Sequence, residues 1–148
     1  GTIVSDKKSY DYLYYEAAIP DTLVPKTQTG YVIAYDKLSN FFEKELPKSG
    51  LNTKEKNQFT EYWLKVLPKS AYYKITFIEE KVLDTLVSLV ITPKPDSILR
   101  VTVRFEPLEK PEIIIPPVFS SFKRDGFTVV EWAGMYKKDK NHPFTCLQ

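Results

Sequence analysis

Two glutamates, Glu16 and Glu131, are the residues of this chain whose type and setting could support catalysis. Each lies in a stretch that is predicted as a β-strand and has aromatic neighbours. If the two strands pair, the carboxyl groups could face each other as a general acid and base, or as the pair of a glycosidase-type hydrolase. The competing interpretations are exposed surface residues, or a structural ion pair with Arg100 or Arg104. Because no spacing in the chain supplies a partner that would tune a carboxyl pKa, we favour a non-catalytic protein.

Metal and cofactor chemistry have little support in the sequence. His142 and Cys146 are the only histidine and cysteine, and His142 sits in a run of charged residues near the C-terminus. A catalytic triad needs its histidine on a rigid scaffold, and a zinc site needs three or four ligands. The five glycines are too widely spaced to cradle a phosphate. We therefore expect no metal and no cofactor.

Aromatic residues, at 14% of the chain, offer a binding surface instead of a reaction. Residues 10–19 are predicted as one strand, in which Tyr12, Tyr14 and Glu16 share a face. With Trp132 from the last predicted strand, these tyrosines could stack on sugar rings, although packing at the edge of the core is the competing interpretation. The candidate binding residues are Tyr12, Tyr14, Arg100 and Trp132.

Composition limits the class of protein and of partner. A chain of 148 residues with 43% hydrophobic and 27% charged residues suits a single folded domain. The net charge is only +2, and the lysines alternate with acidic residues, so we expect no nucleic-acid partner. No apolar run approaches the ~20 residues that span a membrane. The single cysteine excludes an intramolecular disulfide.

The clearest local pattern predicts two amphipathic helices. The first follows Asp36, a suitable N-cap, and ends at Pro47 and Gly50. Its apolar positions fall at helical spacing on one stripe, and they are Leu38, Phe41, Phe42 and Leu46.

The second helix is predicted to follow Asn52, which has capping-box spacing to Glu55, and to end at Pro68. Trp63 lies in the middle of its apolar stripe, so we interpret it as a core residue and not as a ligand platform. The short link through Gly50 predicts that the two helices form a helical hairpin.

Period-two alternation predicts strands at 31–35, 71–78, 98–108 and 126–136. Residues 89–93 and 98–108 flank a Pro-Asp turn and are expected to form a β-hairpin. In 98–108 the apolar residues alternate with Arg100, Thr102 and Arg104, which predicts one solvated face. Residues 79–88 fit either a helical turn or an irregular crossing. The proline-rich stretch 106–117 is expected to be an extended connection or an edge strand.

The order of these elements predicts an α+β fold, with a mainly antiparallel β-sheet and an inserted two-helix hairpin packed on one face. Residues 1–136 are expected to form this single domain, followed by a polar C-terminal tail over 137–148. Glu131 shares a face with Phe127 and Val129, so it continues an apolar row. A carboxylate that is buried there needs a partner, and we expect a strand arginine or backbone donors.

The chain also resembles a family of uncharacterised bacterial exported or cell-surface proteins. The resemblance is carried by "YLYYE", "EYWLK", "PKPDSILRV" and "GFTVVEWAG". These stretches are similar to the family motifs Y-L-F/W-E, Y-W-L-P, P-x-P-D-S/T-x-x-R-V and G-F-x-V-V-E-W-G-G. Two departures are Lys65, where the family usually has proline, and Ala133, where it has glycine. The matched positions are Tyr12, Glu16, Tyr62, Trp63, Pro95, Asp96, Arg100, Glu131 and Trp132.

The resemblance implies a location more than an activity: the cell envelope or the exterior, often at the C-terminal end of a longer protein. Together with the residues, it predicts a non-catalytic domain that binds protein or glycan, or packs against other domains of its parent. Two alternatives stay open. One is a hydrolase with paired carboxylates, and the other is a structural or assembly domain that pairs through a sheet edge. The sequence leaves the oligomeric state undetermined.

Overall fold

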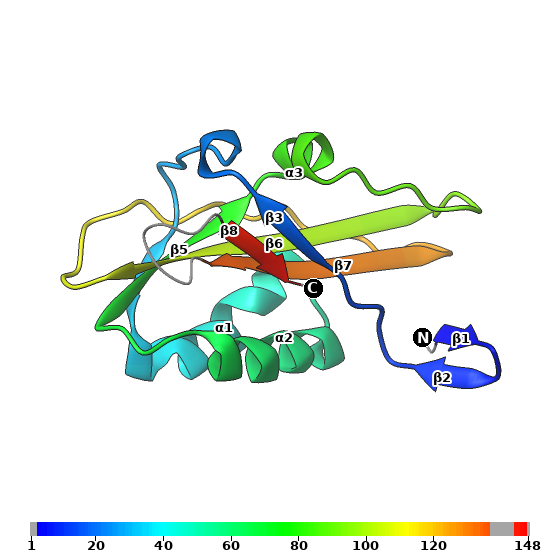
Figure 1. Ribbon diagram of the computed structural model, residues 1–148, viewed down its shortest axis with the longest axis horizontal. Coiled ribbons are helices and arrows are strands. Elements are labelled where there is room, and N and C mark those ends of the chain that lie inside the picture. Colours follow the sequence, from blue (N-terminus) through cyan, green and yellow to red (C-terminus); the bar gives the residue numbers. More distant parts are fainter. Residues whose placement is uncertain (1–2, 137–143, 148) are drawn as a thin grey trace.

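Six strands form one mixed β-sheet with helices on both of its faces (Figure 1). A computed structural model describes residues 3–136 and 144–147 of the protein. The strands are β1 (Ile3–Ser5), β2 (Lys8–Tyr10), β3 (Glu16–Ile19), β4 (Tyr31–Ala34), β5 (Tyr72–Ile78), β6 (Ser97–Leu108), β7 (Thr128–Tyr136) and β8 (Phe144–Leu147). The helices are η1 (Asp21–Leu23), η2 (Tyr35–Lys37), α1 (Leu38–Glu45), η3 (Leu46–Ser49), α2 (Thr53–Val66) and α3 (Glu80–Leu86).

The strand order in the large sheet is β3-β8-β7-β6-β5-β4. Neighbouring strands are antiparallel except for the central pair β6 and β7, which is parallel. Strands β1 and β2 form a separate small antiparallel pair, which lies beyond the end of α2 in Figure 1. The predicted α+β class and the mainly antiparallel sheet are therefore confirmed.

The main core lies between the sheet and helices α1 and α2. Trp63 is fully buried at its centre, with its ring centroid 4.9 Å from that of Phe105 on β6. This confirms Trp63 as a core residue. Aromatic rings in edge and tilted contacts fill most of this layer, which suits the scarcity of small side chains in the two helices. Its buried residues include Leu38, Phe42, Phe59, Tyr73, Val103 and Phe105.

The start of α2 agrees with the sequence, whereas the start of α1 does not. Asn52 Oδ1 accepts a hydrogen bond from Glu55 N at 3.0 Å, and Asn52 N donates to Glu55 Oε2 at 2.8 Å. This is the predicted capping box. Asp36 is not the N-cap of α1, because the chain enters that helix through the 3₁₀ turn η2 and no side chain caps it.

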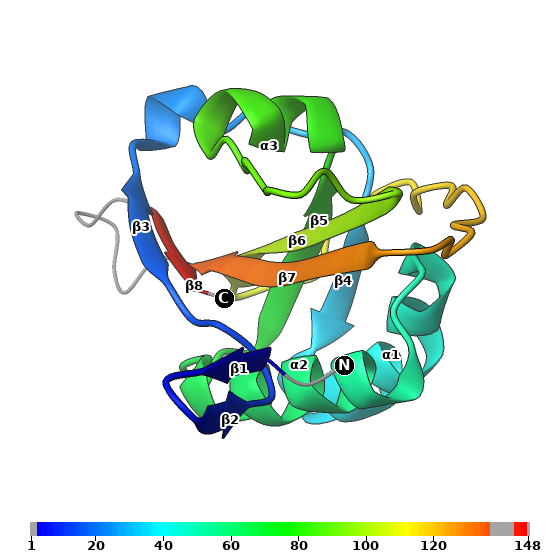
Figure 2. The same ribbon diagram turned by 90° about the vertical axis from the view of Figure 1, so that its right-hand side faces the viewer.

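The predicted β-hairpin of 89–93 and 98–108 is wrong. Residues 89–93 lie outside every strand, and β6 pairs with β5 on one side and β7 on the other. The ambiguous segment 79–88 contains α3, which follows β5 and precedes β6 in the chain. This helix lies on the second face of the sheet, opposite α1 and α2 (Figure 2). Beyond Leu108 the proline-rich stretch is an extended connection, with one parallel bridge from Ile115 to Thr29 beside β4.

The predicted solvated face of β6 is also wrong, because α3 covers it. Arg100, Thr102 and Arg104 are all buried, as are the apolar residues that alternate with them. A second, smaller apolar cluster lies on this face and joins α3 to β7 and β3. Its buried members are Ile19, Val24, Ile78, Leu83, Ala133 and Met135. A strand that is covered on both faces needs partners for its polar residues.

The two ends of the chain differ from the sequence prediction. Residues 11–15 are not part of a strand, so the predicted strand 10–19 splits into the last residue of β2 and the whole of β3. Residues 144–147 form β8, inserted between β3 and β7, and so belong to the sheet and not to a polar tail. The rest of the predicted tail, 137–143 with His142 and also Gln148, lies outside the described residues. Four residues are too few to show a strand period without their neighbours in the sheet.

Candidate functional site

Glu131 forms a buried ion pair with Arg100. The two residues lie directly opposite each other in the parallel register of β6 and β7. Arg100 Nε donates to Glu131 Oε2 at 2.5 Å, and Arg100 Nη2 donates to Glu131 Oε1 at 3.1 Å. The side chains are only 2% and 6% exposed. The sequence interpretation of Glu131 as a structural anchor with a strand arginine is therefore confirmed.

The remaining polar groups around this pair are also occupied. Arg100 Nη1 contacts Asp84 of α3 at 2.9 Å, and Arg100 Nη2 donates to the Val87 carbonyl at 2.9 Å. The Tyr15 hydroxyl donates to Glu131 Oε1 at 3.1 Å. Burial lowers the pKa of Arg100, but the hydrogen bonds and charges of Glu131 and Asp84 outweigh it and leave the pKa raised. Arg100 was a candidate binding residue, but its guanidinium is fully engaged in contacts within the fold.

Glu16 and Glu131 lie on opposite faces of the sheet. Glu16 pairs with Leu147, which pairs with Gly134, so Glu16 shares the face of Gly134 that α2 covers. Side chains alternate between the two faces along a strand, and Glu131 and Gly134 of β7 are separated by an odd number of positions. Glu131 therefore points to the other face, which α3 covers. The Tyr14 hydroxyl donates to Glu16 Oε1 at 2.8 Å, whereas Tyr15 reaches Glu131. The two carboxylates therefore cannot act on one substrate as a pair.

The candidate aromatic residues form a row beside α2. The ring centroids of Tyr12 and Trp132 are 5.7 Å apart, and those of Tyr14 and Tyr62 are 6.4 Å apart. Trp132 is only 8% exposed and also packs against Phe59, so it belongs to the core. Tyr12 and Tyr14 keep 45% and 49% of their surface in solvent. Of the candidate binding residues, only these two tyrosines are accessible.

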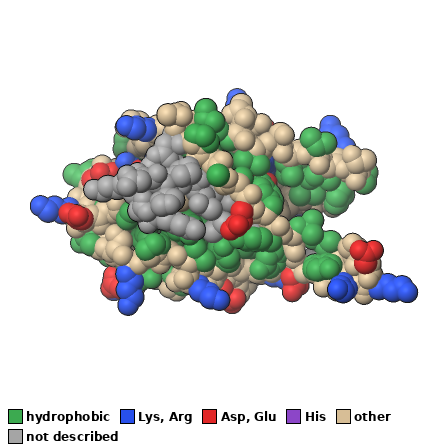
Figure 3. Space-filling model, viewed as in Figure 1, with side chains coloured by type: hydrophobic (Ala, Val, Ile, Leu, Met, Phe, Trp, Pro, Cys, Tyr) green, Lys and Arg blue, Asp and Glu red, His purple; other side chains and the backbone are tan. Residues whose placement is uncertain are grey.

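These tyrosines belong to a short exposed stretch, residues 10–14, which we call the aromatic segment. Tyr10 is exposed and Leu13 is 70% exposed, so large apolar side chains dominate the stretch. Lys54 Nζ of α2 binds Asp11 Oδ1 at 2.8 Å and ties the segment to the helix. Hydrophobic side chains spread across the middle and right of the face in Figure 3, with lysines and arginines mainly around its outline.

Sequence reasoning missed Asp84 and Tyr15 as partners of the buried pair. Asp84 lies in the segment 79–88, for which the sequence did not decide between a helical turn and an irregular crossing. The contact of Asp84 with Arg100 could therefore not be predicted from the sequence. Tyr15 directly follows Tyr14, and neighbouring side chains of an extended chain point to opposite faces. This was the one sign in the sequence that Tyr15 would reach the face opposite Tyr14. Tyr62 was named only among the positions of the family motifs, but its ring packs against that of Tyr14.

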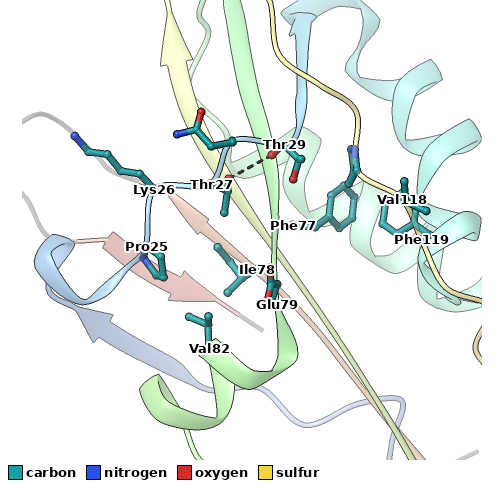
Figure 4. A pocket seen from close by; sticks show the side chains of 12 residues that line it. Pro25, Lys26, Thr27, Thr29, Phe77, Ile78, Glu79, Val82, Val118 and Phe119 are labelled. Carbon is teal, nitrogen blue, oxygen red and sulfur yellow. Dashed lines mark hydrogen bonds between the residues drawn. The ribbon is translucent and has the colours of Figure 1, made fainter.

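A cavity of 530 Å³ lies beyond the end of β5, between the 25–29 loop, α3 and residues 117–119 (Figure 4). Its walls are mainly apolar, and the Lys26 side chain points away from it. The Thr27 hydroxyl is used locally, since it donates to the Thr29 carbonyl at 3.3 Å. A second hollow lies nearby, beside Tyr31 and residues 116–121. At the wall of the second hollow, Tyr31 and Lys48 both donate to Glu45, at 2.7 Å each, so these three polar side chains are paired with one another.

Within residues 3–136 and 144–147, no three His, Cys, Asp or Glu side chains approach closely enough to hold a metal ion. No helix in this part of the chain is long and apolar enough to cross a membrane. Comparison with known proteins found no matching family model, no matching curated protein and no matching solved structure.

Tyr73 provides a pH-dependent test of the core. Its hydroxyl donates to the Pro68 carbonyl at 2.7 Å, and burial, with the nearby Tyr35 and Tyr136, raises the pKa of Tyr73 to about 12. The unfolded chain has a tyrosine pKa of about 10. The stabilisation that Tyr73 contributes is complete below the pKa of tyrosine in the unfolded chain. It is lost as the pH rises through the pKa of Tyr73 in the folded protein.

We therefore expect the free energy of unfolding to fall between pH ~10 and ~12. Urea unfolding at a series of pH values measures this fall. Tyr73→Phe should make the alkaline fall shallower, although the pKa values of Tyr14, Tyr31 and Tyr136 are also raised and will keep part of it. An identical pH slope in Tyr73→Phe and wild type would contradict the prediction.

Proposed function

We propose that this chain is a non-catalytic domain of the bacterial cell surface or exterior, which binds a protein or another domain of its parent through the aromatic segment. The exposure of Tyr10, Tyr12, Leu13 and Tyr14 in one five-residue stretch carries this proposal. Exposed apolar side chains that cluster in this way are typical of protein contact sites. The proposed location rests on the resemblance of the sequence motifs.

The support beneath the segment favours a rigid contact surface. Tyr12 rests on Trp132, and Tyr14 rests on Tyr62, so their exposed faces are held in fixed orientations. In this proposal α1 and α2 act as a helical hairpin that carries the segment. Aromatic side chains held in this way lose little conformational entropy on binding, which makes them effective anchors.

The alternative functions have weaker support. The paired-carboxylate hydrolase loses its geometric basis, because Glu16 and Glu131 lie on opposite faces of the sheet. A sugar-stacking site would use the indole face of Trp132, but that ring is buried. A protein contact needs neither group and uses the side chains that remain exposed.

The experiment compares binding of the labelled chain to isolated bacterial envelope fractions, with and without protease treatment of the fractions. The test variant is Tyr10→Ser with Leu13→Ser, because these two side chains make none of the ring contacts described above. Val90→Ser, at an apolar position elsewhere that is even more exposed, is the matched control. We expect the test variant to weaken binding about tenfold and the control to leave it unchanged.

Three results would count against the proposal. Binding that survives protease treatment would indicate a glycan or lipid target. Equal losses in the test variant and in Val90→Ser would indicate non-specific adhesion. Full binding by the test variant would place the contact elsewhere on the domain. Circular dichroism and thermal unfolding of each variant show whether the fold is intact before binding is compared.

A further inference from the structure

Residues 111–119 form a proline-rich segment that lies beside the start of β4 and exposes large apolar side chains. Ile113 is fully exposed, Val118 is 97% exposed, and Ile115 is largely exposed. We call residues 113–118 the apolar ridge. Exposed apolar side chains that cluster in this way mark a contact site. The ridge lies at the opposite edge of the sheet from β3, which follows the aromatic segment, so the two surfaces are separate.

Contacts with the sheet hold the ridge in one conformation. Gly30 N donates to the Ile115 carbonyl at 2.8 Å, just before β4. Lys74 Nζ of β5 binds Glu112 Oε1 at 2.7 Å, immediately before the ridge. Two consecutive prolines inside the ridge fix their own φ angles. The exposed side chains are therefore positioned before a partner arrives, which lowers the entropy cost of binding.

An apolar cavity opens directly beside the ridge. It is the 530 Å³ cavity of Figure 4, in which Val118 and Phe119 lie on one side and Pro25 on the opposite side. The Phe119 ring packs edge-on against Phe77 with ring centroids 4.9 Å apart, and this contact fixes one wall. Val118 lines both this cavity and the second hollow, so it stands between two depressions. One face of the molecule thus carries an apolar protrusion and an apolar recess side by side.

The rim of the cavity also carries one charge of each sign. Lys26 and Glu79 both line the cavity, and both are exposed. A two-fold axis exchanges protrusion with recess and cation with anion, so a face that has both members of each pair is complementary to itself. A different protein would have to supply a matching recess and matching charges, whereas a second copy of this chain already has them.

We propose that two copies of this chain associate through this face, with the apolar ridge of each copy against the cavity of the other. The contact is isologous, so Lys26 of one copy lies near Glu79 of the other, twice in each dimer. The face involves fewer residues than the roughly 20–30 per partner of a standard interface, so we expect a dissociation constant between about 10 μM and about 1 mM. This association goes beyond the proposed function, because it does not use the aromatic segment.

Sedimentation velocity over a concentration series of the purified chain measures the association. The test variant is Ile113→Asp with Val118→Asp, which places two carboxylates on the ridge at exposed positions. Val90→Asp, at an exposed valine outside every strand and helix, is the matched control. We expect the dissociation constant to rise at least about tenfold in the test variant. It should stay unchanged in the control and in the variant Tyr10→Ser with Leu13→Ser.

A charge exchange tests the two-fold arrangement. Lys26→Glu alone brings two glutamates together at each contact and should raise the dissociation constant about threefold or more. Lys26→Glu combined with Glu79→Lys restores opposite charges across the axis and should regain most of the wild-type affinity. In NMR spectra, the shift changes on dilution should fall on residues 25–29 and 113–119, which line the cavity or form the ridge.

Four results would overturn the inference. A chain that stays monomeric up to about 1 mM leaves no role for a second copy. Association that the ridge variant does not weaken lies elsewhere on the domain, and equal weakening by Val90→Asp indicates non-specific contact. A charge exchange that restores nothing excludes the two-fold pairing. A monomer that binds phosphatidylcholine vesicles through the ridge assigns this surface to lipid. All these measurements use the purified chain without envelope fractions, so failure of the dimer contact and failure of the proposed function are distinguishable.

Discussion

Gly134→Ala is expected to lower the free energy of unfolding by about 3 kcal/mol, at the upper end of the range for overpacked cores. A Cβ at position 134 would lie 2.1 Å from Cζ2 of Trp63 and 2.4 Å from its Cε2. The indole is fully buried, so it cannot move away without displacing the rings around it. Urea unfolding of the variant and the wild type, analysed as a two-state transition, measures the difference.

A double-mutant cycle identifies the cause of this loss. Trp63→Leu removes the indole and leaves space for the added methyl group, although it is destabilising by itself because it opens a cavity. In the double variant the two losses should therefore fall short of their sum by more than about 1 kcal/mol. Additive losses would show that Gly134→Ala acts through the backbone of β7 and not through contact with Trp63.

Glu131→Ala is expected to lower the free energy of unfolding by about 3 kcal/mol, because it leaves a buried guanidinium without its main partner. Arg100 would keep Asp84 and the Val87 carbonyl, but its Nε would have no acceptor from β7. Thermal and urea unfolding of purified protein give the measurement. The exposed pair Lys54–Asp11 is the comparison, since Lys54→Ala should cost less than about 1 kcal/mol.

Replacing both members of the buried pair separates the charge effect from packing. Arg100→Met combined with Glu131→Leu leaves no unpaired buried charge and keeps a similar volume. It should regain most of the stability lost in Glu131→Ala, as apolar replacement of buried ion pairs often does. A double variant that is as unstable as Glu131→Ala would show that the pair stabilises the fold through specific geometry and not through charge balance.

Of the candidate site residues, the sequence indicated a buried partner for Glu131 and placed Tyr12 and Tyr14 at an accessible surface, but it did not predict the burial of Arg100 and Trp132. Glu131 continues an apolar row of its strand, so the need for a buried partner could be inferred locally. Arg100 and Trp132 were expected to be accessible, but both are buried by elements distant in the chain, α3 and α2 respectively. The opposite orientation of Glu16 and Glu131 depends on β8, whose pairing with β3 and β7 sets their relative phase.

The sequence by itself determined the local elements whose pattern is complete within one stretch of chain. Helix α2, its Asn52–Glu55 capping box and the buried position of Trp63 follow from side-chain spacing along a single helix. Strands β4, β5 and β7 follow from period-two alternation, with ends shifted by one or two residues. These features need no information about what lies on the other side of the core.

Only the tertiary structure decided which strands pair and which faces are covered. The parallel pairing of β6 with β7, which brings Arg100 to Glu131, joins residues 31 positions apart. The insertion of β8 and the burial of β6 by α3 likewise depend on contacts between distant segments. Alternation defines the two faces of a strand, but it does not specify the neighbour at either edge or the layer above either face.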